Sequence, residues 1–585
     1  MAQSRLSIAL SDRAFQKQGA LFAMKNRNVL IADEPGLGKT IQSIAAIVGG
    51  QIRGSVLIVA PKTAAYVTWP AELATWLADI SPEDSVRVVG GNDNKKNRLD
   101  IVRDILQWDR DNYPEKQPTD SKPLRQWVIV SPNYLRFKAR TDDKGKYVYN
   151  AQGHKIIQPV REALAPLLAI EWSAVIVDEA HETLAGATGN VKKMSAQRTG
   201  LKLLDVREDG MRIALSGTPF RGKHENLWGI ANWINPIKFP DNSIRPSIGA
   251  LPYWKWIRKH FDVYHDDIYN QDIVGDLISE RALAEETKGY MIRRSKAEVL
   301  PELPLKSYPG TLLYPNKVPN NNDENIWATM EPAQAKAARA QWYVKYNPTA
   351  IWLPMESKQH NAYKQMKREA MADIENGTLI ANSLLAELTR LKQFANSYGA
   401  LDDLGNFAPS FPSNKFDWIL QFLEERNILG DKPSGHKVVI SSQFTKHVNL
   451  FAKALADKGI GAYVLTGQTS AEQRQQYQAE FQSGKTEFGK PSHDVFLMNT
   501  KAGGVGITLD AADDLIIIDS TYNIDDQVQL EDRIHRISRL HAVNIWNLCS
   551  INTIDQQILK TTRQTGQSLK RILDTPESAL ALLDS

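Results

Sequence analysis

The chain has 585 residues, of which 42% are hydrophobic, 24% charged and 8% aromatic, and this composition excludes a largely disordered or fibrous protein. At ~150 residues per domain, the length predicts three to four domains. The single cysteine, Cys549, excludes a disulfide framework and a cysteine-built zinc site, which favours a reducing compartment. No run approaches the ~18 apolar residues of a membrane span, and the first residues lack a secretory signal. The net charge of +4 permits nucleic-acid binding without arguing for it.

Five short apolar runs in the first half of the chain predict the strands of a parallel sheet. Each run is continuously apolar rather than alternating, which is typical of strands covered by helices on both faces. The runs are 29–32, 56–60, 127–130, 174–177 and 212–215. Polar stretches between them predict surface insertions, with the lysine- and arginine-containing cluster at 95–98 in a solvated loop. These stretches are 91–124, 137–160 and 240–285.

The same pattern restarts after about residue 413 and predicts a second parallel sheet. Its runs are 438–440, 462–465, 494–497, 515–518 and 543–546. Leucines at helical spacing predict long helices between the two sheets, over 355–394. The fold class is therefore α/β, with two lobes and a helical connection. The expected divisions are a first lobe over 1–304, a helical linker or protrusion over 305–412, a second lobe over 413–565 and a tail over 566–585.

A glycine-rich loop follows the first predicted strand. Residues 33–40 read DEPGLGKT and precede a helical run. Gly36 and Gly38 let the backbone curl so that its N–H groups face phosphate oxygens. Lys39 can then reach the β- and γ-phosphates, and the Thr40 hydroxyl can bind Mg²⁺. The motif opens on an aspartate where the generic phosphate loop has glycine, which indicates a subset of nucleotide-binding proteins.

Two further motifs follow the ends of later strands, where the chemistry of parallel sheets gathers. Asp178 can hold the magnesium shell, and Glu179 can orient and deprotonate the attacking water. We expect His181 to couple this pair to the next segment. Ser216 and Thr218, within an SGTP sequence, are expected to link the state of the nucleotide to a polymer site.

These segments, in this order, resemble the superfamily 2 helicase-like ATPases and, within them, the Swi/Snf family of DNA translocases. The resemblance extends over about 10–565 and rests on several additional motifs. In the first lobe they are FQKQG at 15–19, APK at 60–62 with WPAE at 69–72, LSGTPF at 215–220, and YMIRRSKAEV at 290–299 with LP at 303–304. In the second lobe they are KVVISSQF at 437–444, NTKAGGVGIT at 499–508 and QLEDRIHRI at 529–537.

The resemblance implies two RecA-like lobes with ATP and Mg²⁺ at their interface and duplex DNA across them. Gln16 matches the glutamine that reads adenine. Gly504 and Gly506 belong to the implied ATP site, and Gln529 to its coupling to the polymer. The sequence departs from the family at SR (538–539), where GQ is usual, and also at 220–222 and 522–524.

The last motif places two arginines three residues apart. On one helix, Arg533 and Arg536 would share a face. Guanidinium groups beside a transferring γ-phosphoryl stabilise its charge, so both are candidate catalytic residues contributed by the second lobe.

The family resemblance also marks basic and hydroxyl side chains that could contact a DNA backbone. They are Lys62, Thr63, Ser441, Ser442, Thr500 and Lys501. No zinc finger or helix-turn-helix pattern is evident, so recognition is expected to be independent of sequence.

The sequence therefore predicts an ATP-dependent, double-stranded DNA translocase in replication, recombination or repair. A strand-separating DNA or RNA helicase is the first alternative. A nucleotide-switched scaffold that binds nucleic acid without moving along it is the second. We further expect a monomer without a membrane partner and a compact bacterial or viral family member in the cytoplasm, with a nuclear location left open.

Overall fold

A computed structural model describes the chain as two compact units, Met1–Pro301 and Glu302–Ser568. The units are treated separately. The described residues are 4–62, 64–90, 95–112, 125–142, 146, 148–149, 157–159, 162–184, 196–220, 224–234, 252–266, 271–304, 306–312, 349–381, 383–428, 434–503, 507–536, 539 and 541–559.

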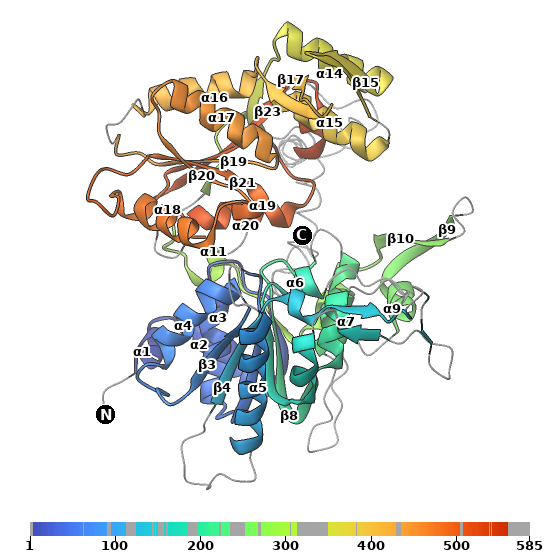
Figure 1. Ribbon diagram of the computed structural model, residues 1–585, viewed down its shortest axis with the longest axis vertical. Helices are drawn as coiled ribbons and strands as arrows, with labels where there is room; N and C mark the ends of the chain where they lie inside the picture. Colours follow the sequence, from blue (N-terminus) through green and yellow to red (C-terminus); the bar gives the residue numbers. More distant parts are fainter. Residues whose placement is uncertain are drawn as a thin grey trace, which may run out of the picture. The chain divides into compact units, whose positions relative to one another are not determined.

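The first unit is built on a seven-stranded sheet in which every neighbouring pair is parallel (Figure 1). In sheet order the strands are β11 (Met291–Ile292), β1 (Asn28–Ile31), β8 (Asp205–Leu215), β7 (Glu171–Val177), β2 (Gly54–Val59), β4 (Arg125–Val130) and β3 (Ser85–Val89). All six residues of β2 are buried, because helices cover both faces of the sheet. The five predicted strands of this half are confirmed.

The helices of the first unit follow the strands in alternation. The longer ones are α1 (Arg5–Asp12), α2 (Ala14–Asn26), α3 (Lys39–Gly49), α4 (Trp69–Leu77), α5 (Lys95–Asn112), α7 (Ala196–Leu203), α8 (Leu227–Ile234), α9 (Tyr253–His260) and α10 (Glu280–Thr287). A 3-10 helix of eight residues is η4 (Glu162–Ala169), and the short helices are η1 (Ala64–Thr68), η3 (Pro132–Leu135), α6 (Ala180–Thr183), η6 (His224–Asn226) and α11 (Lys296–Val299).

The predicted insertions contain ordered elements. The prediction of a solvated loop at 95–98 is wrong, because α5 begins at Lys95. Val102 and Ile105 of α5 are fully buried, and this apolar face packs against β2 and β3. The other two insertions contain the hairpins β5–β6 (Phe137–Ala139, Ile157–Pro159) and β9–β10 (Phe261–Asp266, Gln271–Leu277). In Figure 1 the β9–β10 hairpin projects away from the sheet of the first unit.

The second unit is built on an eight-stranded sheet. Its strands are β13 (Thr311–Leu312), β14 (Thr349–Leu353), β23 (Val543–Ser550), β22 (Asp514–Ile517), β19 (Val438–Ser442), β21 (Val495–Asn499), β20 (Ala462–Leu465) and, also beside β23, β12 (Lys306–Ser307). The five strands predicted after residue 413 are confirmed. Strands β12, β13 and β14 come from the stretch predicted to be a helical linker, so this stretch also contributes to the sheet.

Two helices and two hairpins form a separate core beside this sheet. They are α14 (Ser357–Glu369), β15 (Met371–Ile374), β16 (Gly377–Ile380), α15 (Leu384–Asn396), β17 (Tyr398–Leu401) and β18 (Phe407–Ser410). Met366, Phe394 and Phe407 are buried at its centre with Ile558. The predicted helices over 355–394 are thus interrupted by a hairpin. Left-handed backbone at Ala370 (φ 51°) ends the first helix, and Asn376 (φ 68°) forms the turn.

The remaining helices of the second unit cover the two faces of its sheet. They are α16 (Asn414–Glu425), α17 (Thr445–Asp457), α18 (Ala471–Ser483), α19 (Thr500–Gly503) and α20 (Ile524–Ile534). Among the described residues of both units, no helix combines the length and the apolarity needed to cross a membrane.

A buried histidine makes the stability of the second unit depend on pH. His447 is fully buried, and its Nε2 lies 3.1 Å from the Ser397 hydroxyl. Burial lowers its pKa to about 4. Since the unfolded chain binds a proton near pH 6.5 and the folded chain does not, stability is full above that pH and falls towards pH 4. We expect a loss of about 2 kcal/mol between pH 7 and pH 5 in denaturant unfolding. The variant His447→Asn should lack this component; an unchanged pH dependence would assign it to other groups.

Candidate active site

The glycine-rich loop connects β1 to α3. Gly36 and Gly38 have φ values of 88° and 77°, in the left-handed region that favours glycine. A Cβ on Gly38 would also lie 2.4 Å from the Gln16 amide nitrogen. Gly38 is the N-cap of the 11-residue α3, and no side chain caps this helix end. The first N–H groups of α3 and the helix dipole therefore favour an anion at the loop.

Lys39 holds its ammonium group within this loop. Its Nζ donates hydrogen bonds to the carbonyl oxygens of Asp33 (2.8 Å) and Glu34 (3.4 Å). Burial lowers the pKa of Lys39, although the carboxylates of Glu179, Asp33 and Asp178 act in the opposite direction. The loop thus presents a half-buried cation beside its backbone donors, as phosphate binding requires.

The Gln16 side chain braces the same loop. Its Nε2 donates to the Leu37 carbonyl oxygen (3.2 Å), and Gln42 Nε2 donates to the same oxygen (3.3 Å). Gln16 therefore lies beside the glycine-rich loop, whereas its reading of adenine stays a prediction.

Asp178 follows the end of β7 and is held by two donors. The indole Nε1 of Trp69 donates to Oδ2, and the backbone N–H of Glu179 donates to Oδ1, both at 2.9 Å. Burial, together with the neighbouring charge of Glu179, raises the pKa of Asp178 to about 6. A half-buried carboxylate with its pKa raised in this way is suited to a cation, which would stabilise the charged form.

Glu179 adopts a strained backbone that turns the chain from strand to helix. Its φ of 45° lies in the left-handed region, which is uncommon for a residue with a Cβ and recurs at functional sites. One Glu179 carboxylate oxygen lies 3.5 Å from Nδ1 of His181. The same Nδ1 lies 2.8 Å from the Ser216 hydroxyl and 3.4 Å from that of Thr218. The structure thus brings together the acidic pair, His181 and the SGTP segment.

Two arginines near the C-terminal end of the first unit's sequence contact the glycine-rich loop. Arg294 pairs with the buried Asp33 through Nε–Oδ1 (3.0 Å) and Nη2–Oδ2 (2.5 Å). Arg293 donates to the carbonyl oxygens of Ala32 (2.6 Å) and Gly217 (3.1 Å). Sequence reasoning gave these arginines no role at the site. The available signal was the aspartate that opens the loop, since a buried carboxylate needs a cationic partner.

The second unit places its two candidate arginines near one backbone carbonyl. The prediction that Arg533 and Arg536 share a helix is wrong, because α20 ends at Ile534 with His535 as its C-cap. Their guanidinium groups still converge, since Arg533 Nη1 (3.4 Å) and Arg536 Nη2 (3.3 Å) both donate to the Ile507 carbonyl oxygen.

The other predicted site residues differ in accessibility. Lys62 and Lys501 are exposed. Ser441 and Thr500 are buried with their hydroxyls 2.9 Å apart, and Ser442 donates to Asp519 at 2.5 Å. These hydroxyl groups brace the strand ends, so DNA contact by them stays a prediction.

Several remaining predictions can be placed only in part. Gln529 is buried on α20. Thr63, Gly504 and Gly506 lie outside the described residues.

Comparison with known families decides the assignment. The SNF2-related domain matches residues 15–321, more than half of the chain, and the helicase conserved C-terminal domain matches residues 414–538. The chain belongs to the SNF2-related family. Its two parallel α/β units are the RecA-like lobes of a Swi/Snf-type, ATP-hydrolysing, helicase-like enzyme.

Curated relatives align with nearly the whole chain. Chromodomain-helicase-DNA-binding protein 9 of Mus musculus is 26% identical over 578 residues, which cover 93% of this chain and 16% of that protein. Protein CHROMATIN REMODELING 5 of Arabidopsis thaliana is 25% identical over 580 residues, which cover 96% of this chain and 27% of that protein. The SNF2-related chain therefore spans less than a third of the length of these relatives. A solved structure, the Sulfolobus solfataricus SWI2/SNF2 ATPase core in complex with dsDNA, is 17% identical with a TM-score of 0.33 and covers 96% of this chain and 97% of that one.

Proposed function

We propose that this SNF2-family enzyme is a Mg²⁺- and ATP-dependent translocase on double-stranded DNA. The observation that carries the chemistry is the cluster of Lys39, Asp178, Glu179 and His181 around the glycine loop. Its parts match phosphoryl transfer: backbone donors and an ammonium group for the phosphates, and a carboxylate pair for the cation and the water.

The residues of the first unit fit a magnesium ion that is shared with phosphate. No group of three or more His, Cys, Asp or Glu side chains suited to a metal occurs among the described residues. Mg²⁺ needs few protein ligands in such sites, since phosphates and waters supply the others. Thr40 and Asp178 would hold the ion, which would neutralise charge on the phosphates. Glu179 would accept the proton of the attacking water, and Lys39 would bind the γ-phosphate.

Trp69 offers a direct test of the role of Asp178. The variant Trp69→Phe keeps a buried aromatic ring and removes the N–H donor to Oδ2. Because the loosened carboxylate should hold the cation less well, we expect ~10-fold weaker binding of ATP in Mg²⁺ and unchanged binding in EDTA, in line with the effect of removing partners of metal ligands. Fluorescent-nucleotide titration under both conditions measures the difference.

Trp127→Phe is the matched control for this substitution. Trp127 is equally buried, and its Nε1 donates to Asp84 over the same 2.9 Å, away from the loop. Equal losses in Mg²⁺ and EDTA for Trp69→Phe, or a Mg²⁺-specific loss for Trp127→Phe, would contradict the assignment of Asp178.

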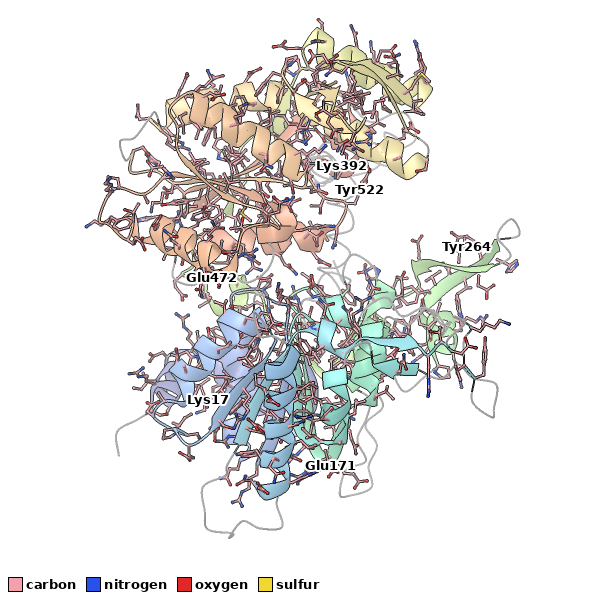
Figure 2. All side chains as sticks on the ribbon, viewed as in Figure 1. Lys17, Glu171, Tyr264, Lys392, Glu472 and Tyr522 are labelled. Carbon is pink, nitrogen blue, oxygen red and sulfur yellow. The ribbon has the colours of Figure 1, made fainter. Side chains whose placement is uncertain are left out.

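Movement along the duplex without obligatory strand separation is favoured over unwinding. A helicase needs a wedge that overcomes stacking of ~1.4 kcal/mol per base-pair step. The projecting β9–β10 hairpin has an exposed Tyr264, as Figure 2 shows, but the stretch 261–277 carries five aspartates and no lysine or arginine. Asp272 is paired with Arg258 and His265, but the excess of aspartates still makes this stretch poorly suited to contact phosphates.

Two substrates distinguish the candidate functions. A triplex reports translocation through release of its third strand, and a tailed duplex reports strand separation. We expect ATP-dependent triplex displacement with little unwinding. Efficient unwinding without triplex displacement would favour the helicase, and ATP-dependent binding without either activity would favour the scaffold.

Recognition of the DNA is proposed to follow the backbone. Comparable affinity for unrelated duplexes of equal length, with steep salt dependence, is the expected result. Discrimination of several kcal/mol between such duplexes would indicate base reading. Movement of this kind could displace bound proteins during replication, recombination or repair.

A further inference from the structure

The chain passes from the first unit to the second through a short stretch whose two ends are both anchored. This stretch, residues 293–308, is named here the connector. At its first end, the buried Arg294–Asp33 pair holds the glycine loop. The backbone N–H of Lys296 also donates to the Glu34 carboxylate at 2.8 Å. A shift of the glycine loop would therefore also displace residues 293–296.

The other end of the connector is anchored to the end of α20. Lys306 Nζ lies 3.1 Å from Glu531 Oε2 and 3.0 Å from Asp532 Oδ1. The Tyr308 hydroxyl donates to the same Glu531 oxygen at 2.7 Å. His535 Nε2 lies 2.6 Å from the Pro304 carbonyl oxygen.

The two carboxylates of these contacts are sheltered from water, whereas Lys306 is half-buried and Tyr308 is exposed. Glu531 and Asp532 are 4% and 5% exposed, so their carboxylates depend on protein partners for compensation. The two carboxylates raise the pKa of Lys306 above its usual range despite burial, which keeps the ammonium charged. Lys306 also belongs to β12, which pairs with β23 and ties the connector to the sheet of the second unit.

The anchored end of α20 leads directly to the two candidate arginines. Arg533 follows Asp532 in the last turn of the helix, and Arg536 follows the His535 cap. Both guanidinium groups are already oriented towards the Ile507 carbonyl. Lys306 holds α20 at Glu531 and Asp532, about one turn before Arg536. A displacement of the connector would therefore change the orientation of both arginines.

We propose that the connector couples the glycine loop to these arginines and that Lys306 is the residue that positions them. Only nine residues separate Lys296, at the loop, from Lys306, at α20. A displacement of the loop on binding of phosphate would be transmitted through the Arg294–Asp33 contact to the connector. The connector would in turn shift the end of α20. This inference rests on the proposed function, in which Arg536 acts on the γ-phosphoryl group.

Two variants of the full chain test the connector. Lys306→Met removes the ammonium and keeps the aliphatic stem. A four-residue Gly-Ser insertion between the exposed Pro301 and Glu302 lengthens the connector and leaves both anchored ends unchanged. For each variant we expect at least a 10-fold fall in DNA-stimulated kcat, with KM for ATP and nucleotide affinity within 2-fold of the unaltered chain. Lys306→Arg, which keeps the charge, should recover part of the rate.

Lys437→Met serves as the matched control. Lys437 is a half-buried lysine of the same unit that packs on the Phe481 ring, with its Nζ 5.1 Å from the ring centre, and it makes no contact with α20 among the described interactions. We expect its stimulated kcat to stay within 2-fold. A general loss of stability would lower the rates of both lysine variants together.

The outcomes separate this inference from the proposed function. Wild-type stimulated kcat for Lys306→Met or for the insertion, with Arg536→Ala inactive, would contradict the coupling role of the connector and leave the proposed function intact. Full activity of Arg536→Ala would instead reject the arginine role on which the connector depends. If Lys306→Met does not fold, the insertion variant decides alone.

Discussion

The variant Glu179→Gln is expected to bind ATP normally and to hydrolyse it ~10²–10⁴-fold more slowly, the usual contribution of a general base. Glutamine keeps the shape of the side chain and removes its ability to accept a proton. Binding should survive because Lys39 and the glycine-loop backbone are unchanged. Equilibrium binding of a fluorescent nucleotide and steady-state hydrolysis with saturating duplex DNA measure the two properties independently.

Two comparisons sharpen this result. Glu182→Gln changes an exposed glutamate of the same short helix, α6, and should hydrolyse ATP at the wild-type rate. Lys39→Ala should lose binding and turnover together, because it removes the ammonium that reaches the phosphates. Wild-type turnover by Glu179→Gln would show that another group accepts the proton.

The core strands of both sheets could be predicted from the sequence because burial on two faces leaves a continuous apolar run. Strand β2 is the clearest example, with all six residues buried. Edge strands lack this signal. Strand β3 has one exposed and three half-buried residues, and β11 and β12 have two residues each. Their pairing depends on partners distant in sequence, which local patterns do not report.

The residues of the candidate site could be predicted from the sequence where a single local motif contains them. Lys39 begins α3 after the glycine-rich loop, and Asp178 and Glu179 directly follow β7, so their positions could be predicted from residue type and spacing, whereas their chemistry stays a prediction. The Trp69–Asp178 hydrogen bond and the Arg294–Asp33 pair join residues more than a hundred positions apart, so no spacing rule reveals them.

The shared-helix argument for the arginines failed at a helix end. The helical spacing of three residues continues from Arg533 to Arg536, but the backbone leaves the helical conformation at His535. That residue contacts the Pro304 carbonyl instead, a tertiary interaction that overrides local helix preference. Helix boundaries are set by such contacts as much as by propensity.

A similar limit applies to residues near the predicted DNA contacts. Lys392 lies in the helical stretch before the second sheet, and its ammonium lies 5.3 Å from the ring centre of Tyr522. Figure 2 shows the two side chains close together in the second unit. Tyr522 is 49% exposed, whereas Lys392 is buried against the Ser520 carbonyl (3.2 Å). Sequence spacing of 130 positions gave no reason to pair them.

Substitution of Arg536 by alanine is expected to leave ATP affinity nearly unchanged and to lower DNA-stimulated kcat by ~10³-fold, as for arginines that stabilise a transferring phosphoryl group. The charge of that group spreads over its oxygens in the transition state, so an arginine that acts there lowers kcat and kcat/KM together. Loss of ground-state binding would raise KM instead, and pre-steady-state nucleotide binding distinguishes the two effects.

Arg426→Ala is the control for this substitution. Arg426 belongs to the same unit, caps α16 and pairs with Asp514 at 3.3 Å. It should lose stability without losing stimulated turnover, because its guanidinium group contacts neither Ile507 nor α20 in any described interaction. Arg536 and Lys39 belong to separate units. A ~10³-fold loss of stimulated kcat in Arg536→Ala, without a loss in Arg426→Ala, would therefore show that hydrolysis requires both units. Equal losses in both arginine variants would indicate a general loss of the second unit's fold rather than a role of Arg536, and no loss in Arg536→Ala would mean that hydrolysis does not depend on this arginine.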